Sequence, residues 1–256
     1  MKIGRFFYKN EIFYGKLNKN EVIKIDNPFE LKESQEKSYP LSKLKILAPC
    51  EPSKIIAVGL NYKDHAKELK MEIPDEPIIF LKPPSAVIAH EETILLPPES
   101  KRVDYEGELA IVIGKPIYRP KTFKEIEEAI FGYTCFNDVT ARDLQKKDGQ
   151  WTRSKSFNTF APLGPFIETE ITDPTSLKIQ TFVNGEVRQD SSTSELIFDP
   201  IELVRFISNI MTLLPGDVIA TGTPPGVGVL KDGDIVEIKI ENIGILKNRV
   251  KALKKE

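Results

Sequence analysis

Residues 104–113 read DYEGELAIVI, and this stretch predicts the longest clear β-strand of the chain. Side chains alternate between the two faces of a strand, so Glu106, Glu108 and the small apolar residues after them share one face. Two carboxylates would then point into an apolar sheet, where an uncompensated charge is costly. A bound divalent cation would satisfy both, because paired hard oxygens suit Mg²⁺, Mn²⁺ or Ca²⁺. The alternative is that this end of the strand is exposed and both carboxylates are solvated, and the spacing alone leaves both readings open.

A third acidic residue lies near the end of the next predicted strand. Asp138 follows the strand 133–136 at the point where a helix begins, and it would complete an all-oxygen metal site. Arg142 and Gln145 are three residues apart on that helix and share a face, from which they could hold a ligand carboxylate or carbonyl. For Arg142 the alternative is a surface salt bridge, which contributes little stability. Asp143 is expected to be a solvated helix residue.

A histidine and a glutamate adjoin on a short helix predicted over 62–70. His65 and Glu68 stand at positions i and i+3, so their side chains lie side by side. A carboxylate that fixes one imidazole nitrogen leaves the other free to act as a base near neutral pH. The alternative is an ordinary surface contact, but the chain has only two histidines, and the other, His90, is expected to be structural or peripheral. Asn61 is expected to cap this helix.

Two further segments carry polar groups that match no nucleotide-binding or nucleophile motif. Lys155 stands shortly before an aromatic residue in WTRSKSF. Residues 221–228 read TGTPPGVG, a rigid loop that can present backbone N–H groups and threonine hydroxyls to a carboxylate. The loop lacks the ending of a phosphate-binding loop, and no dinucleotide-binding unit, serine elbow or Cys–His pattern is visible. Metal-assisted chemistry is therefore the best-supported option.

The overall composition predicts an ordinary globular protein. The chain has 256 residues, 36 Lys plus Arg, 38 Asp plus Glu, a net charge of −2 and 40% hydrophobic residues. These values argue against disorder, coiled coils and an electrostatic nucleic-acid binder. The apolar runs are far shorter than the roughly 20 residues that span a bilayer, and no secretory signal is visible. Cys50 and Cys135 are too few for a disulfide framework, so a reduced cytoplasmic setting is expected.

The chain is predicted to be mostly β with a few short helices, in the α+β class. Residues 1–50 form a small N-terminal β-rich domain that ends in a helix or linker over 32–40, and residues 51–256 form the main domain. The 19 prolines and 15 glycines are spread along breaks between short strands, so a barrel of eight parallel strands is not expected. In the main domain we expect strands at 55–59, 78–81, 105–114 and 133–136 and helices at 62–70, 123–130 and 199–211.

Seven blocks of sequence, taken in order, resemble the fumarylacetoacetate hydrolase family. They read GLNYKDH (59–65), FLKP (80–83), DYEGELA (104–110), NDVTARD (137–143), KSF (155–157), VNGE (183–186) and GTP (222–224). The resemblance spans about three quarters of the chain, and the first 50 residues resemble the short N-terminal extension of some members. It implies a rolled, mixed β-sheet, a Mg²⁺ or Mn²⁺ ion and a homodimer.

The resemblance also implies roles for individual residues. Matched by position, they form three sets: metal ligands (Glu106, Glu108, Asp138), catalytic residues that activate water or lie beside the substrate oxygens (His65, Glu68, Lys155), and substrate-binding residues (Arg142, Gln145, Thr223). In the family the helix that carries the His–Glu pair acts as a lid. Asn158 and Pro225 depart from the Asp and Ala that are common at these positions, which leaves the details of the substrate open.

The implied function is that of a metal-dependent enzyme acting on 2-oxo acids, by hydrolytic C–C bond cleavage of an acylpyruvate or fumarylpyruvate-type substrate. His65, held by Glu68, would deprotonate water for attack on the distal carbonyl, and the departing pyruvate enolate would place its charge near the cation and Lys155. Decarboxylation, isomerisation or dehydration of a related 2-oxo acid on the same site is the alternative. A non-catalytic metal- or carboxylate-binding protein is an alternative of another class. No nucleic-acid or membrane partner is expected.

Overall fold

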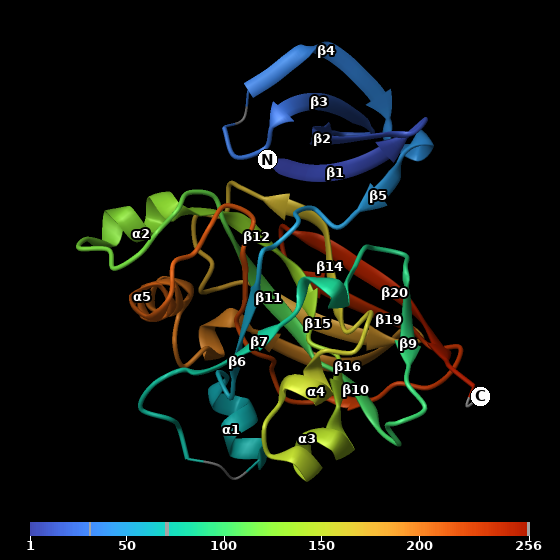
Figure 1. Cartoon of the computed structure of the whole chain (residues 1–256), viewed down its shortest axis with the longest axis vertical. Coiled ribbons are helices and arrows are strands. Elements are labelled where there is room, and N and C mark those ends of the chain that lie inside the picture. The colour runs from blue at the N-terminus through green and yellow to red at the C-terminus, as the bar shows by residue number, and fades with distance from the viewer. Residues whose placement is uncertain (31, 70–71, 255–256) are drawn as a thin grey trace.

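A computed structural model describes residues 1–30, 32–69 and 72–254 of the chain. Most of its regular structure is β-sheet, and short helices lie around the sheets (Figure 1). The predicted class, mostly β with a few short helices, is therefore confirmed. Helices in the described part of the chain are all too short or too polar to cross a membrane.

The largest sheet runs from the N-terminal strands through the centre of the molecule (Figure 1). Its neighbouring strands follow the order β4 (Lys32–Pro40), β3 (Glu21–Asn27), β2 (Glu11–Asn18), β1 (Lys2–Tyr8), β14 (Ala161–Glu168), β12 (Ile130–Asn137), β11 (Gly107–Ile113), β17 (Val218–Ala220), β6 (Ile55–Gly59) and β7 (Ile78–Lys82). Two further strands lie outside this order: β5 (Lys45–Leu47) pairs with β1, and β8 (Val87–Ile88) pairs with β14. The sheet is mixed, because β17 and β6 run parallel whereas β11 and β12 run antiparallel.

Two smaller sheets complete the main domain. One has the order β16 (Glu186–Ser192), β15 (Lys178–Val183), β19 (Ile235–Ile240), β20 (Gly244–Ala252) and β9 (Thr93–Leu96). The other has the order β13 (Thr140–Ala141), β10 (Val103–Tyr105) and β18 (Gly228–Val229). The five-stranded sheet contacts β11 and β12, and in the three-stranded sheet β10 leads directly into β11 while β13 directly follows β12. The three sheets therefore meet near residues 104–108.

The α-helices are short and lie outside the sheets. They are α1 (Lys63–Leu69), α2 (Phe123–Ala129), α3 (Arg142–Asp148), α4 (Thr152–Lys155) and α5 (Pro200–Ile210), with single 3₁₀ turns at Leu41–Lys43, Pro84–Ala86 and Thr193–Glu195. The helix α5 begins with a capping box in which Asp199 and Glu202 each accept a backbone N–H of the other. Its buried face carries Leu203, Val204 and Ile207, as the helical spacing predicts.

The strand β11 divides the core. Leu109, Ile111 and Ile113 belong to one buried hydrophobic cluster, whereas Ala110 and Val112 belong to another. This is the period-two alternation expected of a strand that is buried on both faces. Because β11 lies between β12 and β17, its first residues are held in the interior of the molecule.

The helix or linker predicted over 32–40 is wrong. The structure has the strand β4 there, paired with β3 through contacts such as Val22 with Tyr39. The Tyr39 ring lies 5.4 Å from the ring of Tyr8 and 5.1 Å from that of Phe13. Edge pairing and aromatic packing outweigh the polar composition of the segment, because an edge strand can leave polar side chains in water.

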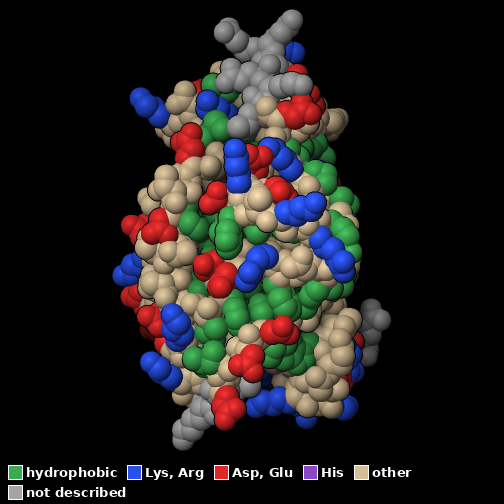
Figure 2. All heavy atoms as spheres, turned by 90° about the vertical axis from the view of Figure 1, so that its left-hand side faces the viewer, with side chains coloured by type: hydrophobic (Ala, Val, Ile, Leu, Met, Phe, Trp, Pro, Cys, Tyr) green, Lys and Arg blue, Asp and Glu red, His purple; other side chains and the backbone are tan. Residues whose placement is uncertain are grey.

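The N-terminal strands join the main sheet directly, since β1 pairs with β14 at Lys2–Glu168 and Ile3–Ile167. The division into two domains at residue 50 stays a prediction. Figure 2 shows the face that carries α2 and α5, where hydrophobic side chains gather in the middle among acidic and basic ones. Phe123 of α2 and Ile210 of α5 are both more than half exposed, at 64% and 52%.

Candidate active site

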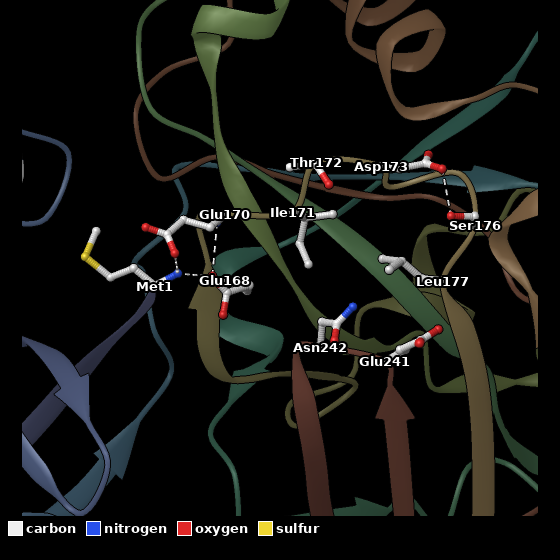
Figure 3. A pocket seen from close by; sticks show the side chains of 10 residues that line it. All are labelled: Met1, Glu168, Glu170, Ile171, Thr172, Asp173, Ser176, Leu177, Glu241 and Asn242. Atoms are coloured by element: carbon white, nitrogen blue, oxygen red, sulfur yellow. Dashed lines mark hydrogen bonds and ion pairs between the residues drawn. The ribbon is translucent and has the colours of Figure 1, made fainter.

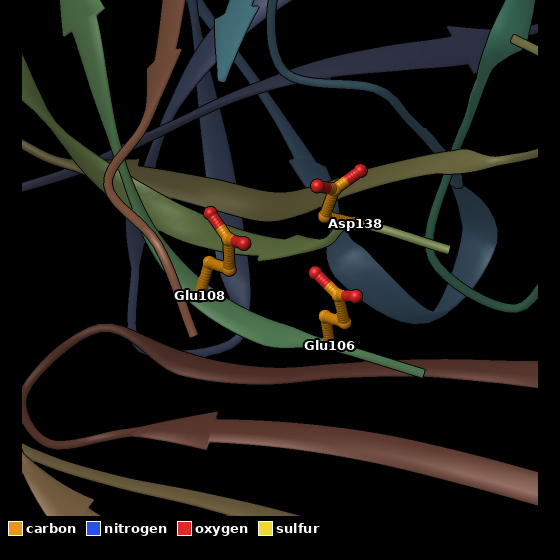
Figure 4. Close-up of side chains that lie close together, drawn as sticks. All are labelled: Glu106, Glu108 and Asp138. Atoms are coloured by element: carbon orange, nitrogen blue, oxygen red, sulfur yellow. The ribbon is translucent and has the colours of Figure 1, made fainter. Parts of the chain in front are cut away.

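Three acidic side chains meet where β10, β11 and β12 come together (Figure 4). Glu106 lies between β10 and β11, Glu108 is the second residue of β11, and Asp138 follows β12. Antiparallel pairing of Gly107 with Asn137 and a 2.8 Å hydrogen bond from the Asp138 N–H to the Glu106 carbonyl bring the two chain segments together. One carboxylate oxygen from each acid lies within 4.8 Å of the other two.

These three carboxylates are buried, so the alternative of solvated side chains at an exposed strand end is wrong. The exposed fractions are 6% for Glu106, 1% for Glu108 and 1% for Asp138. Three buried acids in contact repel one another strongly unless positive charge lies beside them. The three carboxylates can therefore all be ionised only if cations lie beside them.

Three basic side chains supply part of that charge. The Lys155 ammonium lies 3.0 Å from Oε2 of Glu106 and 2.5 Å from Oδ2 of Asp138. The Lys82 ammonium lies 2.5 Å from Oδ1 of Asp138. Arg142 donates from Nη2 to Oε1 of Glu106. Glu106 and Asp138 are thus each held by two of these cations.

Glu108 differs from its neighbours, because no ion pair among the described residues includes it. Its Oε2 accepts the Gly222 N–H at 2.8 Å. Burial, together with the charges of Asp138 and Glu106, raises its pKa well above the ordinary value. Burial acts on Glu106 in the same sense, but Lys155 and Arg142 outweigh it and lower the pKa of Glu106 to about 2. A divalent cation fits this donor set, since it would neutralise the one acid that the basic side chains leave unpaired.

The His65–Glu68 contact predicted from the sequence is present on α1. Nδ1 of His65 lies 2.8 Å from Oε2 of Glu68. The histidine is 8% exposed, whereas the Glu68 side chain is 45% exposed. Because Nδ1 faces the carboxylate, Nε2 is the nitrogen left for chemistry.

The residue Asn61 does not cap α1, contrary to the prediction. Its amide donates to the carbonyls of Phe198 and Thr221 at 3.0 and 2.8 Å, and its oxygen accepts the Phe198 N–H at 2.8 Å. Through these bonds to distant backbone groups, Asn61 connects the start of α1 to the loop before α5. Asp64 adds a second tie, because its Oδ2 accepts the Ser191 hydroxyl at 2.9 Å.

A cavity of about 420 Å³ brings the predicted site residues together. Among the residues that line it are eight of the nine predicted ones: His65, Glu106, Glu108, Asp138, Arg142, Gln145, Lys155 and Thr223. Glu68 reaches the cavity only through His65. The predicted pairing of Arg142 with Gln145 on one helix face is present, with Nη1 donating to Oε1 at 2.7 Å. Asp143, expected to be solvated, accepts the Ser100 hydroxyl at 2.6 Å.

Part of the wall of this cavity is apolar. It is made by Val58, Ile78, Phe80 and Trp151. The rings of Phe80 and Trp151 meet edge to face, with centroids 5.0 Å apart. Lys155 lies over the Phe80 ring at 5.0 Å from its centroid, so the apolar wall begins directly beside the charged centre.

Another cavity, of about 410 Å³, lies beside the N-terminus (Figure 3). Its charged groups already have partners: the Met1 ammonium pairs with Glu168 and Glu170, and Ser176 donates to Asp173 at 2.7 Å. None of the predicted catalytic residues lies among those that line it. The candidate site is therefore the cavity at Glu106.

Residues 54–251 match the family model "Fumarylacetoacetate (FAA) hydrolase C-terminal", which covers well over half of the chain. The chain belongs to the fumarylacetoacetate hydrolase family. Residues 1–49 of this family member match a second model, "Rv2993c-like, N-terminal".

Named relatives of this fumarylacetoacetate hydrolase family member differ in activity. It is 45% identical over 222 residues to the mitochondrial oxaloacetate tautomerase Fahd2a of Rattus norvegicus, covering 82% of this chain and 71% of the rat protein. The crystal structure of 2-hydroxyhepta-2,4-diene-1,7-dioate isomerase from Mycobacterium marinum matches with a TM-score of 0.92, 42% identity and full coverage of both chains. Maleylpyruvate hydrolase from Sphingobium sp. SYK-6, solved with a manganese(II) ion and pyruvate, matches with a TM-score of 0.83 and 29% identity, covering 99% of this chain and 100% of the other.

Sequence reasoning missed Lys82 as a site residue, although it lies in the FLKP block. This lysine ends β7 with its side chain fully buried and bonded to Asp138 and to the Val139 carbonyl. The available signal was a lysine that closes an apolar strand, because a buried lysine requires an acid beside it.

Proposed function

We propose that this family member is a divalent-metal-dependent enzyme that cleaves acylpyruvates hydrolytically at a C–C bond. The observation that carries the proposal is the pairing of Glu68 with His65, which lines the same cavity as the three buried carboxylates. A base and a charged centre that face one cavity meet the needs of water attack on a carbonyl.

The residues proposed to hold the metal are Glu106, Glu108 and Asp138. When bound there, Mg²⁺ or Mn²⁺, or Ca²⁺ as a third hard cation, would supply Lewis-acid polarisation of a 2-oxo acid. The manganese ion and pyruvate in the Sphingobium hydrolase support a metal and a 2-oxo acid as the ligands.

The remaining proposed roles follow from the position of each side chain. Nε2 of His65 takes a proton from water, and Glu68 holds the imidazole in orientation. The hydroxide adds to the distal carbonyl, the C–C bond breaks, and its electron pair passes to the pyruvate fragment as an enolate, which takes up a proton. Lys155 would stabilise negative charge on the substrate oxygens, and Arg142, which shares Glu106 with it, would bind the substrate beside it.

The apolar wall favours an acyl chain over a small dicarboxylate. Phe80 and Trp151 offer aromatic surface in the cavity that the acids line. Burying an apolar chain there is favourable by about 25 cal/mol per Å² of apolar surface. Gln145 and Thr223, which line the same cavity, are proposed to bind the carboxylate end of the substrate, Thr223 through its backbone N–H because its hydroxyl proton is donated to the Gly107 carbonyl.

A second candidate is keto–enol interconversion of oxaloacetate. The 45% identity to the rat oxaloacetate tautomerase favours it. This reaction needs a proton moved at C3 of the 2-oxo acid but no water, and His65 would serve as the base in both reactions. The homodimer and the cytoplasmic setting stay predictions.

The test is a substrate panel followed by NMR. The Mn²⁺- or Mg²⁺-loaded protein is incubated with acylpyruvates of increasing chain length and, separately, with oxaloacetate. Pyruvate and a carboxylic acid in equal amounts support the hydrolase, and faster loss of the oxaloacetate enol with intact acylpyruvates supports the tautomerase. Failure to convert any 2-oxo acid overturns both.

The substitution Glu106→Gln tests the metal centre. It should abolish Mn²⁺ binding, measured by titration calorimetry, together with turnover. Glu128→Gln is the matched control, because Glu128 is an exposed residue whose carboxylate pairs with Lys115 on the surface. Full activity of Glu106→Gln would remove the basis of the proposal.

A further inference from the structure

Gln189 of β16 is a buried side chain whose hydrogen-bonding positions are all used. It is 1% exposed. Its Oε1 accepts the Gly107 N–H at 3.0 Å and the Thr181 hydroxyl at 2.7 Å. Its Nε2 donates to the Thr223 hydroxyl oxygen at 2.8 Å and to the Pro224 carbonyl at 2.7 Å. An amide side chain offers two donors and two acceptor sites, so none is left over.

The orientation of this amide is set by two backbone groups. The Gly107 N–H can only donate and the Pro224 carbonyl can only accept, so Oε1 must face the first and Nε2 the second. The Thr223 hydroxyl accepts from Gln189 and donates its single proton to the Gly107 carbonyl at 2.9 Å. Every proton in this network is therefore assigned.

The network joins two parts of the site that lie far apart in the sequence. Gly107 lies between two of the three acids, Glu106 and Glu108. Thr223 lines the cavity and follows Gly222, whose N–H donates to the Glu108 carboxylate. Gly107 packs closely against β15, since a Cβ added at Gly107 would lie 2.2 Å from Oγ1 of Thr181. Gln189 itself is not among the described residues that line the cavity.

The loop also packs closely against β16 on its other side. Gly226 has φ of +93°, and a Cβ there would lie 2.2 Å from the Arg188 carbonyl oxygen. Glycine is required at this position because other residues rarely adopt this φ and because the Arg188 carbonyl leaves no room for a side chain. The strand β16 therefore serves as the support on which the loop is seated.

We propose that Gln189 is a positioning residue of this site. It seats the Thr223 loop against the segment of Glu106 and Glu108, and so sets where a ligand carboxylate lies relative to the three acids. The inference rests on the proposed function, because it requires a carboxylate ligand beside Thr223. Gln189 acts through Thr223 and Gly107 and does not touch the ligand.

Two variants and a matched control test this role. Gln189→Leu keeps the size of the side chain and removes all of its hydrogen bonds, and Gln189→Asn keeps the amide but is one methylene too short to span from Gly107 to Pro224. The control is Gln180→Leu, on the neighbouring strand β15, where the amide donates to Asp190 at the surface. The probes are Mn²⁺ alone, and then oxalate added to the Mn²⁺-loaded protein.

We expect both Gln189 variants to bind oxalate about 10–100-fold more weakly, the usual effect of removing a residue that orients a metal-site ligand. Their affinity for Mn²⁺ alone should change by less than the affinity for oxalate, because Glu106 and Asp138 keep their basic partners and the pairing of β11 with β12 is retained. A role confined to stability would lower Tm and leave oxalate affinity intact in the folded fraction. Gln180→Leu should change neither affinity.

A double-mutant cycle with Thr223→Ala tests whether Gln189 acts on the ligand through Thr223. If Gln189 acts through Thr223, the double variant should bind oxalate no more weakly than Thr223→Ala alone. Wild-type oxalate affinity in either folded Gln189 variant would overturn the inference and leave the proposed function standing. A wild-type protein that binds Mn²⁺ but not oxalate would overturn the proposed function and this inference together.

Discussion

The ammonium group of Lys82 lies 2.5 Å from Oδ1 of Asp138, with the two side chains 0% and 2% exposed. Lys82 comes from the last strand of the large sheet and Asp138 from the end of a central one. Burial lowers the pKa of Lys82, and the charge of Asp138 opposes that shift. This pair therefore connects the edge of the sheet to the carboxylate cluster.

Replacing Lys82 should destabilise the protein strongly. Lys82→Met leaves Asp138 with one basic partner instead of two, and removing one member of a buried ion pair costs about 3–5 kcal/mol. Urea unfolding measures the loss. Lys115→Met is the control, because its pair with Glu128 is exposed on both sides and contributes about 1 kcal/mol or less. Equal decreases in the free energy of unfolding of the two variants would contradict a buried charge at residue 82.

Removing the imidazole should strongly slow hydrolysis without weakening metal binding. We expect His65→Ala to lower kcat for acylpyruvates by about 10²–10⁴, the usual contribution of a general base. Glu68→Ala should lower it less, since the imidazole remains. Mn²⁺ affinity should stay at the wild-type value in both variants. His90→Ala is the control, because that ring accepts the Lys247 N–H at 3.1 Å and lies outside the cavity.

The aromatic wall should determine how long an acyl chain is accepted. Trp151→Ala removes the ring that packs edge to face on Phe80. We expect kcat/KM for long acylpyruvates to fall about tenfold, which corresponds to ~1.4 kcal/mol, while kcat/KM for oxaloacetate is unchanged. An equal loss for both substrates would mean that the ring supports the fold of the site and not the acyl chain. Trp151 is the single tryptophan of the chain, so its fluorescence reports ligand binding directly.

Both cysteines should resist alkylation in the folded protein. Burial raises the pKa of Cys50 and of Cys135 to about 12. At pH 8, four units lower, about one thiol in 10⁴ is ionised, and the thiolate is the reactive form. A thiol reagent such as dithionitrobenzoate should release colour only after denaturant is added. Fast reaction of the native protein at pH 8 would show that a thiol is exposed.

The same shifts predict a loss of stability in alkali. A thiol whose pKa is raised on folding ionises first in the unfolded chain, where its ordinary pKa is about 9.0. Stability contributed by the neutral thiols is therefore present below pH 9 and lost between pH 9 and 12. Thermal unfolding at increasing pH measures this loss, and Cys135→Ala, which removes one of the two titrating groups, should reduce its slope.

Short-range patterns predicted the local features of the site. The alternation in DYEGELAIVI predicted one long strand, and the structure divides this stretch at Glu106 into β10 and β11, with the predicted alternation present in β11. The spacing of His65 and Glu68 identified a contact that the structure contains. Both follow from backbone geometry alone, because the period of a strand or helix decides which side chains share a face. The same patterns could not say whether Glu106 and Glu108 were solvated or buried.

The failures have a common cause. The polar composition of residues 32–40 predicts a helix or linker, but pairing with the edge of β3 and packing of the Tyr39 ring decide their conformation. Asn61 was expected to serve the nearest helix, and its amide bonds instead to backbone groups 137 and 160 residues away. Local sequence does not encode such partners.

By itself, then, the sequence determined the family, the class of fold, the candidate acids and the His–Glu pair, since each depends on residue type and local spacing. Only the tertiary structure decided that the acids are buried, that no ion pair in the described part of the chain includes Glu108, and that Lys82 and Gln189 support the site. Lys82 meets Asp138 across 56 residues and Gln189 meets Gly107 across 82. Contacts at such separations are set by how the strands pair and how the sheets pack, because that arrangement determines which distant side chains share a dry interior.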